Sequence, residues 1–364
     1  MSRDKERLER VSSRLDEEGI DYMVVLDPVN IRYLAGATID YSACIISRKG
    51  ETILVVPPME YDRAKQVSWV DQVYRYGSGD DEDWIKVDSL EEAVSKLVDG
   101  RVGLPYSYVS HRIFERLSKY IGESLVDCDN IIRGARSIKT AIELDLLSKA
   151  VELVESGIQF AYTVIREGVT ESRVSRESLA FFIKRGADKV YDDLIVASGP
   201  RSAFPHGRAS DKVLRMGEPI TLDYVAAYEG YWGDVTRTVF MGEANQEIRR
   251  IYEVVEEALY TAIDKIYAGV EAKEVDRAAR SVIEKAGYGK YFIHSTGHGL
   301  GLEIHEAPRL SSKSGDALEE NMVVTVEPGI YVSGLGGVRI ENDVVVTSGG
   351  ARVLNRLPTE LIIL

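Results

Sequence analysis

The sequence predicts an α+β protein, in which a small N-terminal α/β domain precedes a larger domain of mainly antiparallel strands flanked by helices. Three observations support this fold class. The chain has 364 residues, which suggests two domains at roughly 150 residues each, and its 45% hydrophobic content allows each domain a core. Short helices and strands alternate over the first 130 residues. Long helices followed by glycine-punctuated strands make up the remainder.

The N-terminal domain, residues 1–130, begins with a predicted amphipathic helix at about 3–18, before the apolar strand YMVVL. DPVNIRYLAG then predicts a short capped helix, and SACIIS and ETILVV flank the turn RKGE as a hairpin. The later predicted elements are the helix MEYDRAKQV, the strand RVGLPY and a helix at 109–120. This domain contains no recognisable chemistry of its own.

The boundary falls in the short basic segment DNIIRGARSIKT, and we assign residues 131–364 to the second domain. A long amphipathic helix is predicted directly after this segment, at 141–166. The other predicted elements are helices at 172–186, 246–266 and 272–286, and strands near 190–198, 219–226, 231–240 and in the glycine-punctuated C-terminal part. Nearly all residues with metal or acid-base chemistry lie in this domain.

The overall composition excludes several functional classes. A formal net charge of −14 disfavours binding to a phosphate backbone, so no nucleic-acid partner is expected. The charged N-terminus lacks a signal peptide's apolar core, and no apolar run approaches the roughly 18 residues that span a bilayer. We therefore expect a cytoplasmic protein without a membrane partner. Cys44 and Cys128, far apart and in apolar contexts, are expected to be buried small hydrophobic residues.

A histidine cluster lies in HSTGHGLGLEIHE, residues 294–306, with spacings of four and seven. In a helix these spacings would align three metal ligands on one face. Gly297, Gly299 and Gly301 argue against a helix, because each costs about 1 kcal/mol relative to alanine in a helix interior. Alternating glycines instead indicate a backbone that passes close to something, and we expect this to be room for a substrate backbone. The segment is therefore predicted as strand or loop.

Two pairs of carboxylates occur in predicted hairpins. ITLDYVAAYEGYWGDVTRTVF has apolar residues alternating on both sides of AYEG, and a turn centred between Tyr228 and Glu229 would place Asp223 directly opposite Asp234. Like charges at such cross-strand positions repel, so either one is protonated or a cation lies between them. In the second hairpin, MVVTVEPGIYVSGLGGVRIENDVVV, Glu327 and Glu341 are equidistant from Gly334.

These acids have two interpretations. Most strand carboxylates lie on solvated faces, and one pair alone would be read in that way. Two pairs within apolar strands, together with the histidine cluster, favour a metal site. Four carboxylates and an imidazole suit Mn²⁺, Fe²⁺ or Co²⁺, and four negative charges can hold two divalent ions, an arrangement suited to hydrolysis.

The ordered pieces LDYVAAYEGYWGDVTRT, HSTGHGLGLEIHEAPR, TVEPGIY and GVRIEND resemble the pita-bread metallopeptidases, which include methionine aminopeptidase, aminopeptidase P and prolidase. DYMVVLDPVNIRYLAGA and RSIKTAIELDLLSKAVEL resemble the N-terminal domain and the junction of prolidases, aminopeptidases P and creatinases. The similarity covers nearly the full length. Methionine aminopeptidases usually lack this first domain, so the chain most resembles a compact prolidase of the archaeal and bacterial type.

The resemblance implies a creatinase-like N-terminal domain, a pita-bread catalytic domain with a curved sheet, and a set of metal ligands. The implied ligands are Asp223, Asp234, His298, Glu327 and Glu341. All five are present, unlike in creatinase, which shares the fold without the metals. The implied cofactors are two divalent ions per subunit, Mn²⁺ or Co²⁺, with Fe²⁺ or Zn²⁺ as alternatives.

The resemblance also assigns roles outside the metal shell. His206 and His305 would stabilise the charge of the tetrahedral oxygen. As a separate hypothesis about mechanism, the implied metal ligand Glu327 would also transfer a proton to the leaving nitrogen. For His294, a substrate-binding role and a structural role remain equally open. The expected substrate-binding set also contains Arg309, which resembles the prolidase carboxylate anchor but has a surface arginine as its alternative, and Arg339, expected to orient Glu341.

The function implied is therefore metal-dependent hydrolysis of Xaa-Pro dipeptides. The bond before proline has no N–H, and a metal site does not need that hydrogen for recognition. An aminopeptidase P that acts on longer peptides with proline in the second position is the alternative, and a non-catalytic pita-bread binding module is a third possibility. By analogy with the family, a homodimer is expected.

Overall fold

The computed structural model describes residues 4–191 and 194–364. The chain divides into two compact units, Met1–Arg136 and Ser137–Leu364. The domain boundary expected at 130/131 lies inside helix α6, Asp129–Ser137. Within the described residues, no helix combines the length and apolarity needed to cross a bilayer.

The first unit is built on a seven-stranded mixed sheet with the strand order β5-β4-β3-β2-β1-β6-β7. Its central strands β1, β2 and β3 are antiparallel, and the remaining neighbours pair in parallel. The strands are β1 Tyr22–Val25, β2 Ala43–Ser47, β3 Thr52–Val56, β4 Gln72–Gly77, β5 Trp84–Lys86, β6 Val102–Leu104 and β7 Leu125–Asp127, and the helices before α6 are α1 Lys5–Glu17, α2 Pro28–Ala35, α3 Tyr61–Val67, α4 Leu90–Ser95 and α5 His111–Ile121.

Sequence reasoning found the buried centre of this sheet and missed its edges. The β2–β3 hairpin and the Asp27 cap of α2 are confirmed. Strands β4 and β5 were not predicted, because β4 is only partly buried along its length and β5 has three residues, too few to show an apolar alternation. Cys44 and Cys128 are buried free thiols, as predicted, and burial raises the pKa of Cys44 to about 12.

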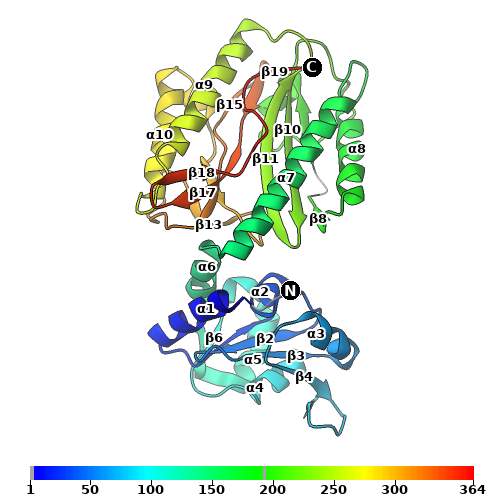
Figure 1. Ribbon diagram of the computed structural model, residues 1–364, viewed down its shortest axis with the longest axis vertical. Helices are drawn as coiled ribbons and strands as arrows, with labels where there is room; N and C mark the ends of the chain where they lie inside the picture. The colour runs from blue at the N-terminus through cyan, green and yellow to red at the C-terminus, as the bar shows by residue number, and fades with distance from the viewer. Residues whose placement is uncertain (1–3, 192–193) are drawn as a thin grey trace. The chain divides into compact units, whose positions relative to one another are not determined.

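The second unit combines long helices with mainly antiparallel strands, which confirms the predicted fold class. Figure 1 shows α7 and α8 together against the hairpin β10–β11, and α9 and α10 together on the opposite flank. The helices are α7 Ala141–Val164, α8 Glu171–Lys184, α9 Gln246–Ile263 and α10 Ala272–Lys285. Helix α7 begins with a capping box between Thr140 and Glu143.

The strands of this unit form three sheets. The first has the order β19-β11-β10-β8, with β9 also paired to β10, and the second has the order β13-β12-β14-β17-β18. The third is the hairpin β15–β16. The strands are β8 Lys189–Val190, β9 Ile195–Ser198, β10 Pro219–Tyr228, β11 Tyr231–Phe240, β12 Gly297–Gly299, β13 Glu306–Leu310, β14 Val323–Val326, β15 Gly329–Val332, β16 Gly336–Arg339, β17 Asn342–Thr347, β18 Gly350–Val353 and β19 Ile362–Ile363. The strand predicted near 190–198 is partly outside the described residues.

Candidate metal centre

The β10–β11 hairpin corrects the predicted register. Tyr228 pairs with Tyr231, so the turn consists of Glu229 and Gly230. Both turn residues have positive φ, as a two-residue hairpin loop of the I′ type requires, and the glycine adopts that conformation at little cost. The predicted turn was centred one residue too early, because AYEG lacks the Asn-Gly or Asp-Gly signal that would have located it.

Asp223 therefore lies opposite Thr236 rather than opposite Asp234, which pairs with Val225. A shift of two residues in a strand preserves the face of the sheet, since side chains alternate with a period of two. The two aspartates consequently remain on one face as diagonal neighbours. The predicted juxtaposition was wrong in its register, but both carboxylates still face the same space.

The second pair of carboxylates, Glu327 and Glu341, lies where the pairing of β14 with β17 ends and that of β15 with β16 begins. The two pairings continue in the same register. Val326 pairs with Asn342 in β14–β17, and Gly329 pairs with Arg339 in β15–β16. The same register matches Glu327 with Glu341 between the two ladders, as their symmetry about Gly334 predicts. Backbone hydrogen bonds connect this junction to its surroundings, because Glu327 N donates to Thr296 O and Glu341 N donates to Thr236 O, at 2.8 and 3.1 Å.

His298 lies in the short strand β12, so the segment is strand and loop, as predicted. The alternating glycines, however, do not leave room for a substrate. A Cβ atom on Gly297 would collide with the carbonyl oxygen of Thr325, and one on Gly299 would collide with that of Ala307. The glycines are needed because the chain's own neighbouring strands pass so close, and the expectation of substrate room is wrong.

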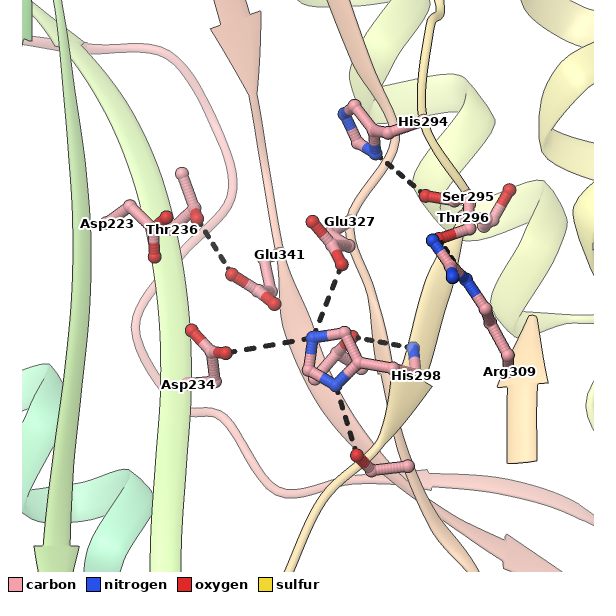
Figure 2. Close-up of polar contacts among 12 residues, drawn as sticks. Asp223, Asp234, Thr236, His294, Ser295, Thr296, His298, Arg309, Glu327 and Glu341 are labelled. Atoms are coloured by element: carbon pink, nitrogen blue, oxygen red, sulfur yellow. Dashed lines mark hydrogen bonds and ion pairs between the residues drawn. The ribbon is translucent and has the colours of Figure 1, made fainter. Parts of the chain in front are cut away.

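Five side chains converge on one space from these strands (Figure 2). We call them the floor residues, and they are Asp223, Asp234, His298, Glu327 and Glu341. His298 Nε2 lies 3.9 Å from Asp234 Oδ2 and 3.5 Å from Glu327 Oε1. Ligand atoms of Asp234, His298 and Glu341 all lie within 4.8 Å of one another, which is the spacing of groups that share a metal ion. The floor residues line a cavity of about 690 Å³.

The charges of the floor are not balanced by the protein itself. Burial, and then the charge of Glu341, raises the pKa of Asp234 and Glu327 well above the usual carboxyl values. Burial and the charge of Asp223 raise the pKa of Glu341 to about 8. Arg339 neutralises one charge by donating to Asp223 Oδ2 at 2.7 Å, while Asp223 Oδ1 is buried and has no hydrogen-bond partner within residues 4–191 and 194–364. Such a cluster fits a bound cation.

The tautomer of His298 supports the same conclusion. Its Nδ1 lies 3.0 Å from the carbonyl oxygen of Gly299, which can only accept, so Nδ1 carries the proton. Burial lowers the pKa of this imidazole to about 4, with His305 adding to the effect, so the ring is neutral. Nε2 then directs a lone pair toward the carboxylates of Asp234 and Glu327. Without a cation, this lone pair and the two carboxylates repel each other. With a bound metal ion, Nε2 would be a ligand while the backbone carbonyl of Gly299 holds Nδ1 and so fixes the ring.

Some of the predicted site residues that are not metal ligands lie at the rim of this cavity, and the others lie in its interior. We call His206, His305 and Arg309 the rim residues, because each is exposed and lines the cavity. The imidazole of His305 packs edge-on against His298, with ring centroids 4.4 Å apart. Arg309, in the edge strand β13, donates through Nε to Ser295 Oγ at 3.3 Å.

His294 and Arg339 belong to one internal chain of hydrogen bonds. Arg339 Nη1 donates to the Tyr331 hydroxyl, which donates to His294 Nε2, each at 2.8 Å. His294 Nδ1 in turn donates to Ser295 O. Because both ring nitrogens of His294 form hydrogen bonds within the protein, the geometry favours a structural role for this residue over a role in substrate binding. Arg339 bonds Asp223 and reaches Glu341 through Thr236, so its expected role in orienting Glu341 stays a prediction.

Three further residues at the site were missed by sequence reasoning. Thr236 donates to Glu341 Oε2 at 2.7 Å, and Asp343 Oδ2 accepts from the backbone N–H of Asp234 at 3.1 Å. Tyr331 connects Arg339 to His294. All three are polar residues inside otherwise apolar strands, and this pattern of DVTRT, GIY and END was the available signal.

Two family models match the chain. The model of metallopeptidase family M24 matches residues 145–348, and that of the creatinase/prolidase N-terminal domain matches residues 7–138. The first match contains all five floor residues, and together the two matches cover most of the chain.

Relatives of known structure or activity match over the full length. The chain is 38% identical to the Xaa-Pro dipeptidase of Pyrococcus furiosus over 98% of this chain and 100% of the relative. It resembles the solved Xaa-Pro dipeptidase from Bacillus anthracis with a TM-score of 0.91 and 37% identity over 99% of both chains. An X-Pro aminopeptidase from Thermotoga maritima has a TM-score of 0.87 and 34% identity over 96% of this chain and 100% of that one.

Proposed function

The chain belongs to metallopeptidase family M24 and has a creatinase/prolidase N-terminal domain, and on this basis we propose that it is a metal-dependent Xaa-Pro dipeptidase. The observation that carries the proposal is the neutral imidazole of His298, whose Nε2 lone pair faces the carboxylates of Asp234 and Glu327. Both full-length relatives named dipeptidases support the same assignment.

The five floor residues would hold two divalent ions. Four carboxylates and one guanidinium leave three negative charges, which exceeds what one divalent ion neutralises. Oxygen-rich donors with a single imidazole favour Mn²⁺ or Co²⁺, with Fe²⁺ or Zn²⁺ as alternatives. When bound, such ions supply Lewis acidity toward the scissile carbonyl and make water a better nucleophile at neutral pH.

Glu327 is the residue suited to move a proton. Its carboxyl group is largely buried, and its pKa is raised well above the usual range by burial and by Glu341. A carboxylate in that environment accepts a proton readily and can deliver it to the leaving nitrogen of proline. Its position at the junction between β14 and β15 fixes it beside His298.

His305 and His206 are suited to stabilise the negative charge that develops on the carbonyl oxygen. Burial and the charge of Arg309 lower the pKa of His305, so it is neutral and still offers one N–H. Within the described part of the chain, neither ring is engaged by a hydrogen bond, and both line the cavity. A donor kept free for the transition state contributes to kcat rather than to substrate binding.

Arg309 is suited to bind the substrate's terminal carboxylate. In an Xaa-Pro dipeptide this group directly follows the proline ring, and a guanidinium can bind it with two parallel hydrogen bonds. Among the residues that the structure describes, only Nε of Arg309 forms a hydrogen bond, with a serine hydroxyl, which leaves its other nitrogens for the substrate. This feature favours a dipeptidase over an enzyme that acts on longer peptides.

The test compares turnover of Ala-Pro, Ala-Pro-Ala and Met-Ala with Mn²⁺ or Co²⁺ added. A dipeptidase should cleave Ala-Pro well and the other two poorly. Preference for Ala-Pro-Ala would instead support an aminopeptidase, which the likeness to the Thermotoga maritima enzyme keeps as the second candidate. Elemental analysis addresses a non-catalytic binding module, which should contain no stoichiometric transition metal. The proposed homodimer is tested by light scattering of the purified chain.

A further inference from the structure

The segment Ser198–Ser210 carries His206 to the rim of the cavity. It leaves β9, forms the 3₁₀ turn Gly199–Ala203 and returns beside its own start, so it is a compact loop of the Ω type. Loops of this kind depend on their internal and anchoring hydrogen bonds, because no regular ladder runs through them. One anchor of this loop is the carboxylate of Glu171.

Glu171 is the first residue of α8, and its side chain is fully buried. Oε1 accepts from the backbone N–H and the hydroxyl of Ser198, at 2.7 and 2.8 Å. Oε2 accepts from the backbone N–H and the hydroxyl of Ser210, at 3.1 and 2.6 Å. One carboxylate therefore binds both ends of the loop. The N-terminus of a helix also stabilises a negative charge at this position.

A fifth hydrogen bond connects Glu171 to Arg201, a residue inside the loop. Arg201 Nε donates to Glu171 Oε2 at 3.0 Å, and Arg201 Nη2 donates to Arg208 O at 2.6 Å. The intervening residues turn back tightly, since Gly207 N donates to Phe204 O. The bond from Arg201 to Arg208 closes the segment that contains His206. The position of His206 thus depends on the guanidinium that Glu171 holds.

The far side of the loop contacts the buried part of the site. Ser202 Oγ accepts from Gly337 N at 2.8 Å, and Pro205 O accepts from Arg339 Nη1 at 3.2 Å. Arg339 also binds Asp223 of the floor. The loop is therefore held on one side by the site and on the other by Glu171, with His206 between these two supports.

We propose that Glu171 is a positioning residue of the active site, which acts on the reaction through His206. Glu171 is not among the residues that line the cavity, so its effect must be transmitted by the loop. Five donors converge on two carboxylate oxygens, and a glutamine cannot replace this acceptor, because its amide group would direct hydrogens at one set of these donors. The inference rests on the proposed function for its kinetic part only.

The test uses the full-length enzyme with the substitution Glu171→Gln and the matched control Glu155→Gln. Glu155 is also a buried helix carboxylate, and its Oε1 accepts from the backbone N–H groups of Arg356 and Leu357, away from the loop. We expect E171Q to retain its bound metal, to lose kcat on Ala-Pro about tenfold or more, and to show faster amide exchange at residues 198–210. E155Q should leave both kcat on Ala-Pro and the rate of amide exchange at residues 198–210 unchanged.

The specific readout is a double-mutant cycle with His206→Ala. Because Glu171 acts through His206, E171Q/H206A should lose no more activity than H206A alone. Additive losses, or equal effects of E171Q and E155Q, would overturn the proposal. If E171Q fails to fold, the milder Ser210→Ala, which removes one of the five donors, takes its place under the same criteria.

These results also separate the two hypotheses. If the unmodified enzyme fails to cleave Ala-Pro, the proposed function is wrong, and the amide-exchange comparison still decides whether Glu171 anchors the loop. If the unmodified enzyme cleaves Ala-Pro and E171Q exchanges residues 198–210 as slowly as the unmodified enzyme does, only the positioning role is wrong.

Discussion

The floor and the rim of the cavity are held in different ways. The floor residues lie in or directly beside paired strands and are largely buried, so their positions follow from the register of the ladders. The rim residues are exposed and lie on or near irregular segments, at a loop after β9 and at the edge strand β13. The floor is thus positioned by backbone pairing, and the rim depends on side-chain anchors such as Glu171.

This difference implies a division of roles. The floor collects negative charge that the protein leaves unbalanced, which fits the binding of metal ions. The rim offers two imidazoles, of which that of His305 is neutral, and a guanidinium, and these groups fit a substrate and its developing charge. Changes in the floor should therefore remove metal and activity together, whereas changes in the rim should reduce activity while the metal stays bound.

The largest effect is expected for Asp234→Asn in the floor. This substitution keeps the size of the side chain and removes one charge, so we expect the stoichiometric metal to be lost and kcat/KM on Ala-Pro to fall by about a thousandfold or more. Elemental analysis and steady-state kinetics measure the two effects. The metal-free variant should unfold no earlier than the metal-free parent, because one repulsive buried charge is gone. Full turnover after metal removal would contradict the assignment of the floor.

A smaller effect is expected for His305→Ala in the rim. Loss of one donor to the developing charge should lower kcat on Ala-Pro by about a hundredfold and leave the metal content unchanged. The matched control is His111→Ala, a histidine that is 83% exposed in the first unit and should have no effect on turnover. Loss of metal from H305A would mean that His305 contributes to metal binding, and the assignment of separate roles to the floor and the rim would then be wrong.

The two regions also differ in how far the sequence predicted them. The parity of strand positions placed Asp223 and Asp234 on one face even though the turn was assigned one residue too early. The symmetry about Gly334 predicted the match of Glu327 with Glu341. Regular periodicity was sufficient in both cases.

Irregular segments lack the regular alternation of side chains that made these predictions possible in the strands. The hydrogen bonds from Tyr331 to His294 and from Ser210 to Glu171 join residues far apart in the chain, and no spacing rule predicts them. The same limit explains the misreading of Gly297 and Gly299, because their close neighbours lie on the separate strands β14 and β13, which only the tertiary fold brings beside them. Local patterns predict the face on which a residue lies, whereas the partners across that face depend on the tertiary fold.

A more selective effect is expected for Arg309→Met. Loss of the guanidinium should raise KM for Ala-Pro by about tenfold, while turnover of bound substrate changes less. Ala-Pro-amide, which lacks the terminal carboxylate, is the matched substrate and should be affected little by the substitution. An equal rise in KM for both substrates would assign Arg309 to general packing of the rim and weaken the case for a dipeptidase.

The smallest effect, a shift of a few degrees in unfolding temperature, concerns the floor without metal. The folded-state pKa of Glu341 is about 8, above its unfolded value of 4.5, so between these pH values the folded chain binds more protons and stability falls as pH rises. The folded-state pKa of His298 is about 4, below its unfolded value of 6.5, and it acts in the opposite direction only below pH 6.5.

Thermal unfolding of the metal-free protein between pH 6.5 and 8 therefore isolates the carboxylates, and the midpoint should decrease across this range. With bound divalent metal the carboxylates stay charged in the folded state and protons compete with the metal, so the midpoint should stay level or increase with pH. D234N, with one charge fewer, should show a weaker decrease than the parent. A metal-free midpoint that is independent of pH would mean that the floor carboxylates are already balanced by the protein, and the distinction between the acidic floor and the rim would lose its electrostatic basis.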